Sequence, residues 1–386
     1  MKTGTLTWHF LNNYGSVLQT YALQHTLSHI PGIENEVIAY RNVVHQSLIQ
    51  AVLSYCKKNG LVNTLKACIQ YPFKRFCRKQ LVFPSEDFDK FRSRYVLCSS
   101  KSYNSDTVNS VVDEYDAFIV GSDNVWITQP ETGEPRGLSD RHYFLDFVPS
   151  SKIRISYAAS MGNPEISDEG RENFRQLFTT IDYISVRERK TAETISSIIG
   201  RDVAWVVDPT LLLDADEWNK IEAASENALE PNSYILVYVI YELADSAAIF
   251  QYAKYLSSLL KKKIVYLGYH KEEGEIKNTY VPVPDFLYLI NHASYIITNS
   301  FHGTVFSIIY RKSFAAFPPR DGATRITDTL ESFHLSDRYA TTLEDAKKMP
   351  LNLDYTKINH YIEERRAYSK EWLLTALTPN KLGKEQ

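Results

Sequence analysis

The most reactive combination of side chains follows a predicted strand at 295–298 and consists of Ser300, Phe301, His302, Gly303 and Thr304. An apolar stretch at 305–310 comes next and predicts a helix. This order would place hydroxyls, an imidazole and a glycine at a helix N-terminus, where free N–H groups and the helix dipole favour a phosphate or carboxylate. The alternative is that Ser300 only caps the helix and His302 only satisfies a loop carbonyl.

Three arginines could contribute planar cationic contacts to such an anion. Arg187 follows the mostly apolar run at 183–186, and Arg320 and Arg325 flank a short loop after another predicted strand. A guanidinium can bind a carboxylate or a phosphate through two parallel hydrogen bonds. The alternative is that each arginine forms a surface ion pair. For Arg187 the partner would be the neighbouring Glu188.

An acidic side chain follows the predicted strand at 117–120, in the sequence Gly121-Ser122-Asp123-Asn124. Asp123 could act as a general base or accept a hydrogen bond from a sugar hydroxyl. An Asx-type turn or a cap is the alternative.

Motifs for metals and nucleotides are weak or missing. Asp214-Ala215-Asp216 matches the D-x-D pattern with which many glycosyltransferases hold a metal–nucleotide, but Glu217 follows Asp214 by three residues and favours a helix start. The sequence contains no H-E-x-x-H and no paired Cys and His, so we predict no metal site. It also lacks G-x-x-x-x-G-K-[ST] and G-x-G-x-x-G, which disfavours ATP and NAD.

The elements that would position these loops alternate between short apolar runs and amphipathic stretches, which is typical of βα units around a parallel sheet. In the first half we predict strands at 6–10, 117–120, 153–158, 183–186 and 203–207, with helices at 16–28 and 188–199. In the second half we predict strands at 234–241, 264–268, 295–298 and 313–317, with helices at 245–262 and 284–292. Ligands of open α/β sheets bind at the carboxyl ends of strands, where all the candidate loops would lie.

A polar stretch at 225–233 separates the two halves and contains the loop signal Glu230-Pro231-Asn232-Ser233. We therefore predict an α/β protein with two doubly wound, Rossmann-like domains at 1–224 and 233–350. A last helix at 355–376 mixes apolar side chains with charges, and we expect it to pack across the domain junction.

Composition narrows the function classes. The 386 residues are 44% hydrophobic and carry a net charge of −3, which gives no reason to expect a nucleic-acid partner. Four cysteines without a C-x-x-C pair fit a reduced, cytoplasmic protein. Neither a signal peptide nor a run of about 20 apolar residues is visible.

One segment is strongly basic. From Lys57 to Lys101 there are eleven Lys or Arg against three Asp or Glu, interleaved with aromatic and aliphatic residues. This pattern suits peripheral contact with the anionic inner face of a membrane. The alternative is a set of solvated helices with ordinary core faces.

Taken in order, the candidate loops resemble the polysaccharide pyruvyl transferase family. The matching stretches are Asn13–Leu23, Gly121–Trp126, Ser156–Ser160, Ile184–Glu188, Asp208–Leu213 and Ser300–Thr304. The resemblance implies a fold similar to B-type glycosyltransferases, with two domains facing a cleft. It also implies that phosphoenolpyruvate is the donor, that two sugar hydroxyls accept its three-carbon unit as a cyclic ketal with release of phosphate, and that no separate cofactor is needed.

The resemblance also implies roles for the matched residues. The donor would lie mainly on the C-terminal domain, at Ser300, Phe301, Gly303, Thr304, Arg320 and Arg325, with a contribution from Arg187. His302 would be the acid or would stabilise the leaving phosphate, and Asp123 would be the base. The acceptor would face Asn13, Tyr14, Ser122, Asp123 and Trp126.

This sequence departs from the family pattern Gly-Ser-Asp-Gln-x-Trp-Asn, because Asn124 and Ile127 replace the Gln and the final Asn. The change predicts a different acceptor subsite. The expected acceptor is a sugar or a lipid-linked oligosaccharide in surface-polysaccharide assembly. Two other readings stay open: a glycosyltransferase that uses a nucleotide sugar, and a non-catalytic carbohydrate-binding member.

Overall fold

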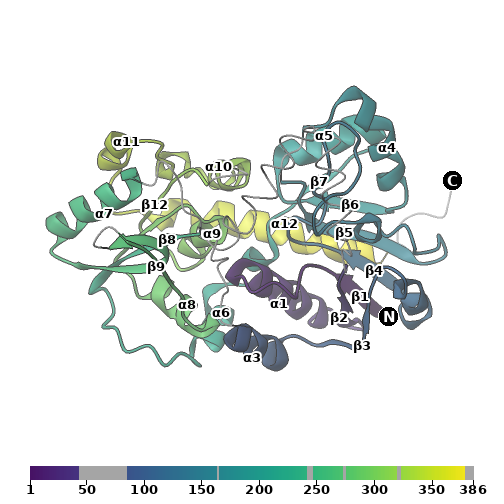
Figure 1. Cartoon of the computed structure of the whole chain (residues 1–386), viewed down its shortest axis with the longest axis horizontal. Helices are drawn as coiled ribbons and strands as arrows, with labels where there is room; N and C mark the ends of the chain where they lie inside the picture. Colours follow the sequence, from purple (N-terminus) through teal and green to yellow (C-terminus); the bar gives the residue numbers. More distant parts are fainter. Residues whose placement is uncertain (43–84, 163–164, 241–246, 273–274, 320–322, 379–386) are drawn as a thin grey trace, which may run out of the picture.

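The computed structural model describes residues 1–42, 85–162, 165–240, 247–272, 275–319 and 323–378 (Figure 1). Arg320, three of the four cysteines and the basic segment up to residue 84 lie outside these residues. The predicted membrane contact of that segment therefore stays a prediction. None of the described helices is both long enough and apolar enough to span a membrane.

The first half of the described chain forms a parallel sheet with the strand order β3-β2-β1-β4-β5-β6-β7. Its strands are β1 Lys2–Leu6, β2 Glu34–Tyr40, β3 Cys98–Tyr103, β4 Ala117–Val120, β5 Ile153–Ala159, β6 Tyr183–Val186 and β7 Ala204–Trp205. The central strand β4 is buried along its whole length, as expected for an apolar run in a sheet covered on both faces. The helices of this half are α1 Tyr14–Ser28, α3 Ser85–Tyr95, α4 Asp168–Thr179, α5 Arg189–Ile199 and α6 Ala215–Glu222.

The second half of the described chain forms a sheet with the order β10-β9-β8-β11-β12, in which only the edge strand β10 is antiparallel. Its strands are β8 Tyr234–Val239, β9 Lys263–Glu272, β10 Glu275–Thr279, β11 Tyr295–Thr298 and β12 Phe314–Ala316. Its helices are α7 Ala247–Leu260, α8 Val283–Asn291, α9 Phe301–Ile309, α10 Ala323–Ser332 and α11 Leu343–Lys348. The predicted α/β class with parallel strands is confirmed.

The two halves are joined by packing and by the last helix, α12 Asn359–Leu377. Tyr14 of α1 stacks on Phe286 of α8 with 4.2 Å between ring centroids, inside a hydrophobic cluster that draws residues from both halves. Figure 1 shows α12 as the long yellow helix that runs between the halves. Arg366 of α12 donates to the carbonyl of Leu211, while Tyr355, just before α12, donates to the carbonyl of Ser307.

The first strand differs from its prediction. It spans 2–6 instead of 6–10, because the small polar residues at its start are buried and satisfied within the sheet. The Asn35 amide donates to the hydroxyls of Thr3 (2.8 Å) and Thr5 (3.0 Å), so these residues need no water. The predicted strand at 6–10 is therefore wrong in its bounds.

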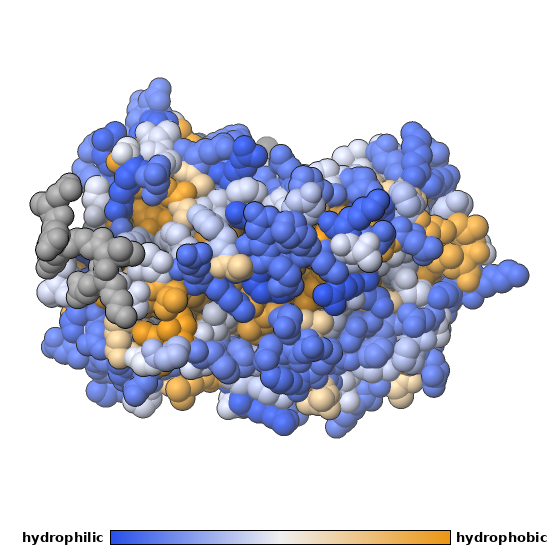
Figure 2. All heavy atoms as spheres, turned by 180° about the vertical axis from the view of Figure 1, so that it is seen from behind, coloured by the Kyte–Doolittle hydropathy of each residue, from blue (hydrophilic) through white to orange (hydrophobic). Residues whose placement is uncertain are grey.

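The D-x-D stretch has the structural role that we favoured. The Asp214 carboxylate accepts the N–H of Glu217 at 2.9 Å and caps α6. Among the described residues no group of three or more His, Cys, Asp or Glu is arranged to hold a metal. Figure 2 shows that the face behind the view of Figure 1 is mostly hydrophilic, with hydrophobic side chains in separate patches.

His9, in the loop after β1, makes the stability of the fold depend on pH. Burial lowers the pKa of its imidazole to about 4, whereas the unfolded chain binds this proton near the ordinary value of 6.5. The free energy of unfolding should therefore fall by roughly 3 kcal/mol as the pH drops from 7 to 4, because the unfolded state takes up the proton first. Urea unfolding of the wild type and of His9→Asn across this pH range measures how much of the fall in the free energy of unfolding comes from His9. The control variant is His360→Asn, because the side chain of His360 is 80% exposed. Parallel pH curves for wild type and His9→Asn would contradict the assignment.

Candidate functional site

Arg187, the residue after β6, lies at the centre of a charged cluster between the two halves. Its side chain is only 1% exposed, so it is not the surface arginine that we considered. Nη1 donates to Asp208 (2.9 Å), Nη2 donates to the amide oxygen of Asn124 (3.0 Å), and Nε lies 3.4 Å from Glu188. Three strand-end loops thus supply acceptors to one guanidinium.

Asp208 follows β7 and is the nearest carboxylate to Arg187. It is 2% exposed, and its second oxygen accepts the N–H (3.0 Å) and the hydroxyl (2.7 Å) of Thr210. Burial alone would raise the pKa of Asp208, but His302, Arg187 and Thr210 lower it well below its usual range. Asp208 is therefore ionised at neutral pH. No role was predicted for Asp208, although it lies in the matched stretch Asp208–Leu213.

His302 reaches the same carboxylate from the second half. Its Nε2 lies 3.7 Å from Asp208 Oδ1, and its side chain is 12% exposed. The ring packs against Gly15 of α1, where an added Cβ would come within 2.1 Å of His302 Nδ1. Only a glycine at position 15 leaves room for the imidazole ring. The two halves of the chain are therefore in contact at His302 and Gly15.

Arg325 of α10 brings a second guanidinium to the cluster. Its Nη1 donates to Asn124 Oδ1 at 3.2 Å, and the same oxygen accepts from Arg187. The ring of Phe301 lies 4.9 Å from the Arg187 guanidinium and 6.0 Å from that of Arg325. Two cations from different halves thus converge on one oxygen atom, beside an aromatic face.

Two more carboxylates complete the cluster. Asp123, 7% exposed, accepts the Ser16 hydroxyl at 2.6 Å and lies 4.0 Å from Arg187 Nη2. Glu188 accepts the Ser160 hydroxyl at 2.5 Å, and burial raises its pKa despite the opposing effect of Arg187 and Arg325. Both serines lie in the matched stretches, but neither was assigned a role, because a hydroxyl partner is recognised only once the loops are placed side by side.

The turn that begins α9 is capped from within. The Ser300 hydroxyl accepts the N–H of Gly303 at 3.1 Å, and the Thr304 hydroxyl donates to the carbonyl of Ser300 at 3.0 Å. Ser300, Gly303 and Thr304 are buried, and a Cβ on Gly303 would lie 2.4 Å from Thr298 Oγ1. The capping interpretation of Ser300 is confirmed, and the donor contacts expected at Ser300, Gly303 and Thr304 stay a prediction. Phe301 and His302 are the residues of the turn that contact the cluster.

Most of the predicted acceptor residues are buried. Trp126 is fully buried and donates to the carbonyl of Tyr143, while Tyr14 is 1% exposed and donates to the carbonyl of Val281. Ser122 is fully buried and donates to the carbonyl of Ala158. These three side chains fill and satisfy the core, so they offer no surface to a sugar. Asn13 is half-buried and caps α1 by accepting the N–H of Gly15.

Comparison with known proteins supports both the family and the fold. The family model described as "Polysaccharide pyruvyl transferase" matches residues 13–321. No curated protein matches the chain at a significant level.

Among solved structures, the chain is similar to a UDP-GlcNAc 2-epimerase from Methanocaldococcus jannaschii, with 14% identity, a TM-score of 0.53, and coverage of 98% of this chain and 100% of that chain. It is also similar to the UDP-GlcNAc 2-epimerase from Neisseria meningitidis, with 11% identity, a TM-score of 0.51, and coverage of 98% and 100%. These likenesses show the fold, which is that of B-type glycosyltransferases, as predicted.

Proposed function

The chain belongs to the polysaccharide pyruvyl transferase family, a family of transferases, and from this membership we propose that it transfers the pyruvyl unit of phosphoenolpyruvate to two hydroxyls of a sugar. The products are a cyclic ketal and phosphate. The acceptor is a sugar of a surface polysaccharide or of its lipid-linked precursor.

The observation that carries this proposal is the oxygen atom shared by two arginines. Asn124 Oδ1 accepts from Arg187 at 3.0 Å and from Arg325 at 3.2 Å. An anionic oxygen of the donor would replace this neutral amide oxygen and gain two charge-assisted hydrogen bonds. Phosphoenolpyruvate carries a carboxylate and a phosphate close together, which suits a pair of guanidiniums drawn from the two halves.

The remaining residues fit the proton transfers of ketal formation. His302 gives a proton to C3 of the enol, which makes C2 electrophilic, and the first hydroxyl adds to C2 as Asp123 takes its proton. The second hydroxyl then forms the other C2–O bond, the bond from C2 to the phosphate oxygen breaks, and phosphate leaves with the remaining proton. Asp208 stays ionised and holds Arg187 and His302 in place.

Calorimetric titration tests the donor. The purified protein is titrated with phosphoenolpyruvate and, separately, with UDP-GlcNAc in the presence of magnesium. We expect saturable binding of phosphoenolpyruvate and none of UDP-GlcNAc. The reverse result would overturn the proposal and favour a nucleotide-sugar enzyme.

Arg325→Ala tests the shared-oxygen geometry. Loss of one charge-assisted contact at a half-buried position should weaken phosphoenolpyruvate binding by roughly 10- to 100-fold. Arg311→Ala is the matched control, because Arg311 is exposed and donates to Asn359 away from the cluster. Equal donor affinity in wild type and Arg325→Ala would contradict the role of Arg325.

A further inference from the structure

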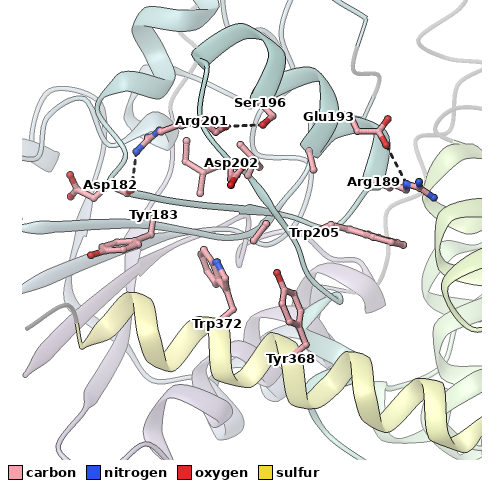
Figure 3. Close-up of a pocket in the computed structure, with 14 residues that line it drawn as sticks. Asp182, Tyr183, Arg189, Glu193, Ser196, Arg201, Asp202, Trp205, Tyr368 and Trp372 are labelled. Carbon is pink, nitrogen blue, oxygen red and sulfur yellow. Dashed lines mark hydrogen bonds and ion pairs between the residues drawn. The ribbon is translucent and has the colours of Figure 1, made fainter. Parts of the chain in front are cut away.

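A second concave region lies outside the charged cluster. It has a volume of about 580 Å³ and is bounded by β6, β7, α5 and α12 (Figure 3). Pockets that hold small ligands measure about 300–1,000 Å³. Neither the family resemblance nor the cluster around Arg187 accounts for this pocket.

Aromatic side chains from three elements line the pocket, namely Tyr183, Trp205, Tyr368 and Trp372. Tyr368 and Trp372 are four residues apart on α12, so they lie on one face of that helix. Tyr368 is 44% exposed, and the other three are half-buried. Arg365 lies 4.2 Å from the ring centroid of Trp205 and supports that ring. Aromatic rings presented in a concave site suit the C–H faces of sugar rings, and the hydroxyl of Tyr and the N–H of Trp add polar contacts.

The charges around the pocket nearly balance. It is lined by three carboxylates and two guanidiniums, from Asp182, Glu193, Asp202, Arg189 and Arg201. Arg189 pairs with Glu193 at 3.2 Å, and Arg201 donates to backbone carbonyls, one of them that of Asp182. No excess of positive charge is available for a phosphate. Hydroxyl groups match this mixture of donors and acceptors better than an anion or an aliphatic chain does.

The pocket and the Arg187 cluster share a wall. The indole N–H of Trp205 donates to the Arg187 carbonyl at 3.2 Å. Tyr183 begins the strand that Arg187 follows, so their Cα atoms lie about 13 Å apart at 3.3 Å per residue. A sugar chain of a few residues can span such a distance.

We propose that this aromatic pocket binds uncharged sugar residues of the acceptor chain, next to the sugar that is modified. The inference rests on the proposed function, because it takes the acceptor to be an oligosaccharide. The pocket would then select for an acceptor of more than one sugar.

Saturation-transfer NMR without any donor tests the pocket. The probes are cellotriose, maltotriose, β-1,4-galactobiose and α-1,6-mannobiose, each titrated into wild type, Tyr368→Ala, Trp372→Leu and Tyr255→Ala. Tyr255, 39% exposed on α7, is an aromatic control outside the pocket. We expect at least one probe to bind, with about tenfold weaker binding in both pocket variants and unchanged binding in the control.

Two results would overturn the inference: binding of none of the probes by wild type, or equal binding by wild type and the pocket variants. Titrating the same proteins with phosphoenolpyruvate separates this question from the reaction. If phosphoenolpyruvate fails to bind wild type while sugar binding depends on Tyr368 and Trp372, the proposed donor is wrong and the pocket is supported as a sugar site.

Discussion

Arg187→Met is expected to lower the free energy of unfolding by about 3–5 kcal/mol, because it leaves a buried carboxylate without its charged partner. Methionine keeps much of the arginine stem but not its hydrogen bonds. Asp208 is fully shielded and its pKa lies well below its usual range, so it stays charged at neutral pH. Glu188 and Asp123 lose the same cation.

Urea unfolding at pH 7 measures the loss, and a double variant identifies its cause. Arg187→Met/Asp208→Asn removes both charges and should recover part of the lost stability. Arg154→Met is the matched control, since Arg154 pairs with the 36% exposed Asp182 one strand away. That pair is partly solvated, so the control should lose less. A loss of under 1 kcal/mol in Arg187→Met, or no recovery in the double variant, would contradict the assignment.

The free energy of unfolding of the wild type should depend on pH because of the same ion pair between Arg187 and Asp208. The unfolded chain protonates Asp208 near its usual value of about 3.9, whereas the folded state keeps it ionised to lower pH. The stabilisation is therefore fully present above that value and is lost as the pH falls towards the folded pKa. In Arg187→Met this acid-dependent component should be reduced.

Local pattern predicted the strands that are mostly apolar. The bounds of β4, β6 and β11 match their predictions, because short runs such as Ala117–Val120 are buried on both faces and end in polar loops. The start of β1 was missed, because its threonines are satisfied by Asn35, about 30 residues later. Such pairing between polar side chains leaves no periodic signal in the sequence.

The charged cluster was predicted only in part. Arg187 and His302 were found because strand-end loops meet at one edge of a sheet. Asp208 and Asn124 were not assigned roles, because their partners lie on other loops. Arg325, which donates to Asn124, lies 201 residues later in the chain. Conversely, Tyr14 and Trp126 share motifs with site residues but point into the core. Proximity in sequence does not determine which way a side chain faces.

His302→Gln is expected to lower the rate of ketal formation by about 10²- to 10⁴-fold, the usual contribution of a general acid. The arginines of the cluster cannot give up a proton at neutral pH, and Asp208 carries none. Imidazole exchanges protons in this range. Glutamine retains a polar side chain beside Gly15, and the contacts that we propose for the donor's anionic groups are with Arg187 and Arg325. Phosphoenolpyruvate affinity should therefore change much less than turnover.

Phosphate release with a sugar acceptor, measured alongside donor titration, distinguishes this role from a structural one. Glu188→Gln is the decisive comparison, because Glu188 lies beside Arg187 and burial raises the pKa of its carboxyl. Its carboxylate is 2% exposed and already accepts from Ser160, so we expect its loss to reduce turnover less than the loss of His302. If Glu188→Gln abolishes phosphate release while His302→Gln retains it, the proton comes from Glu188, and the imidazole serves only to join the two halves at Gly15.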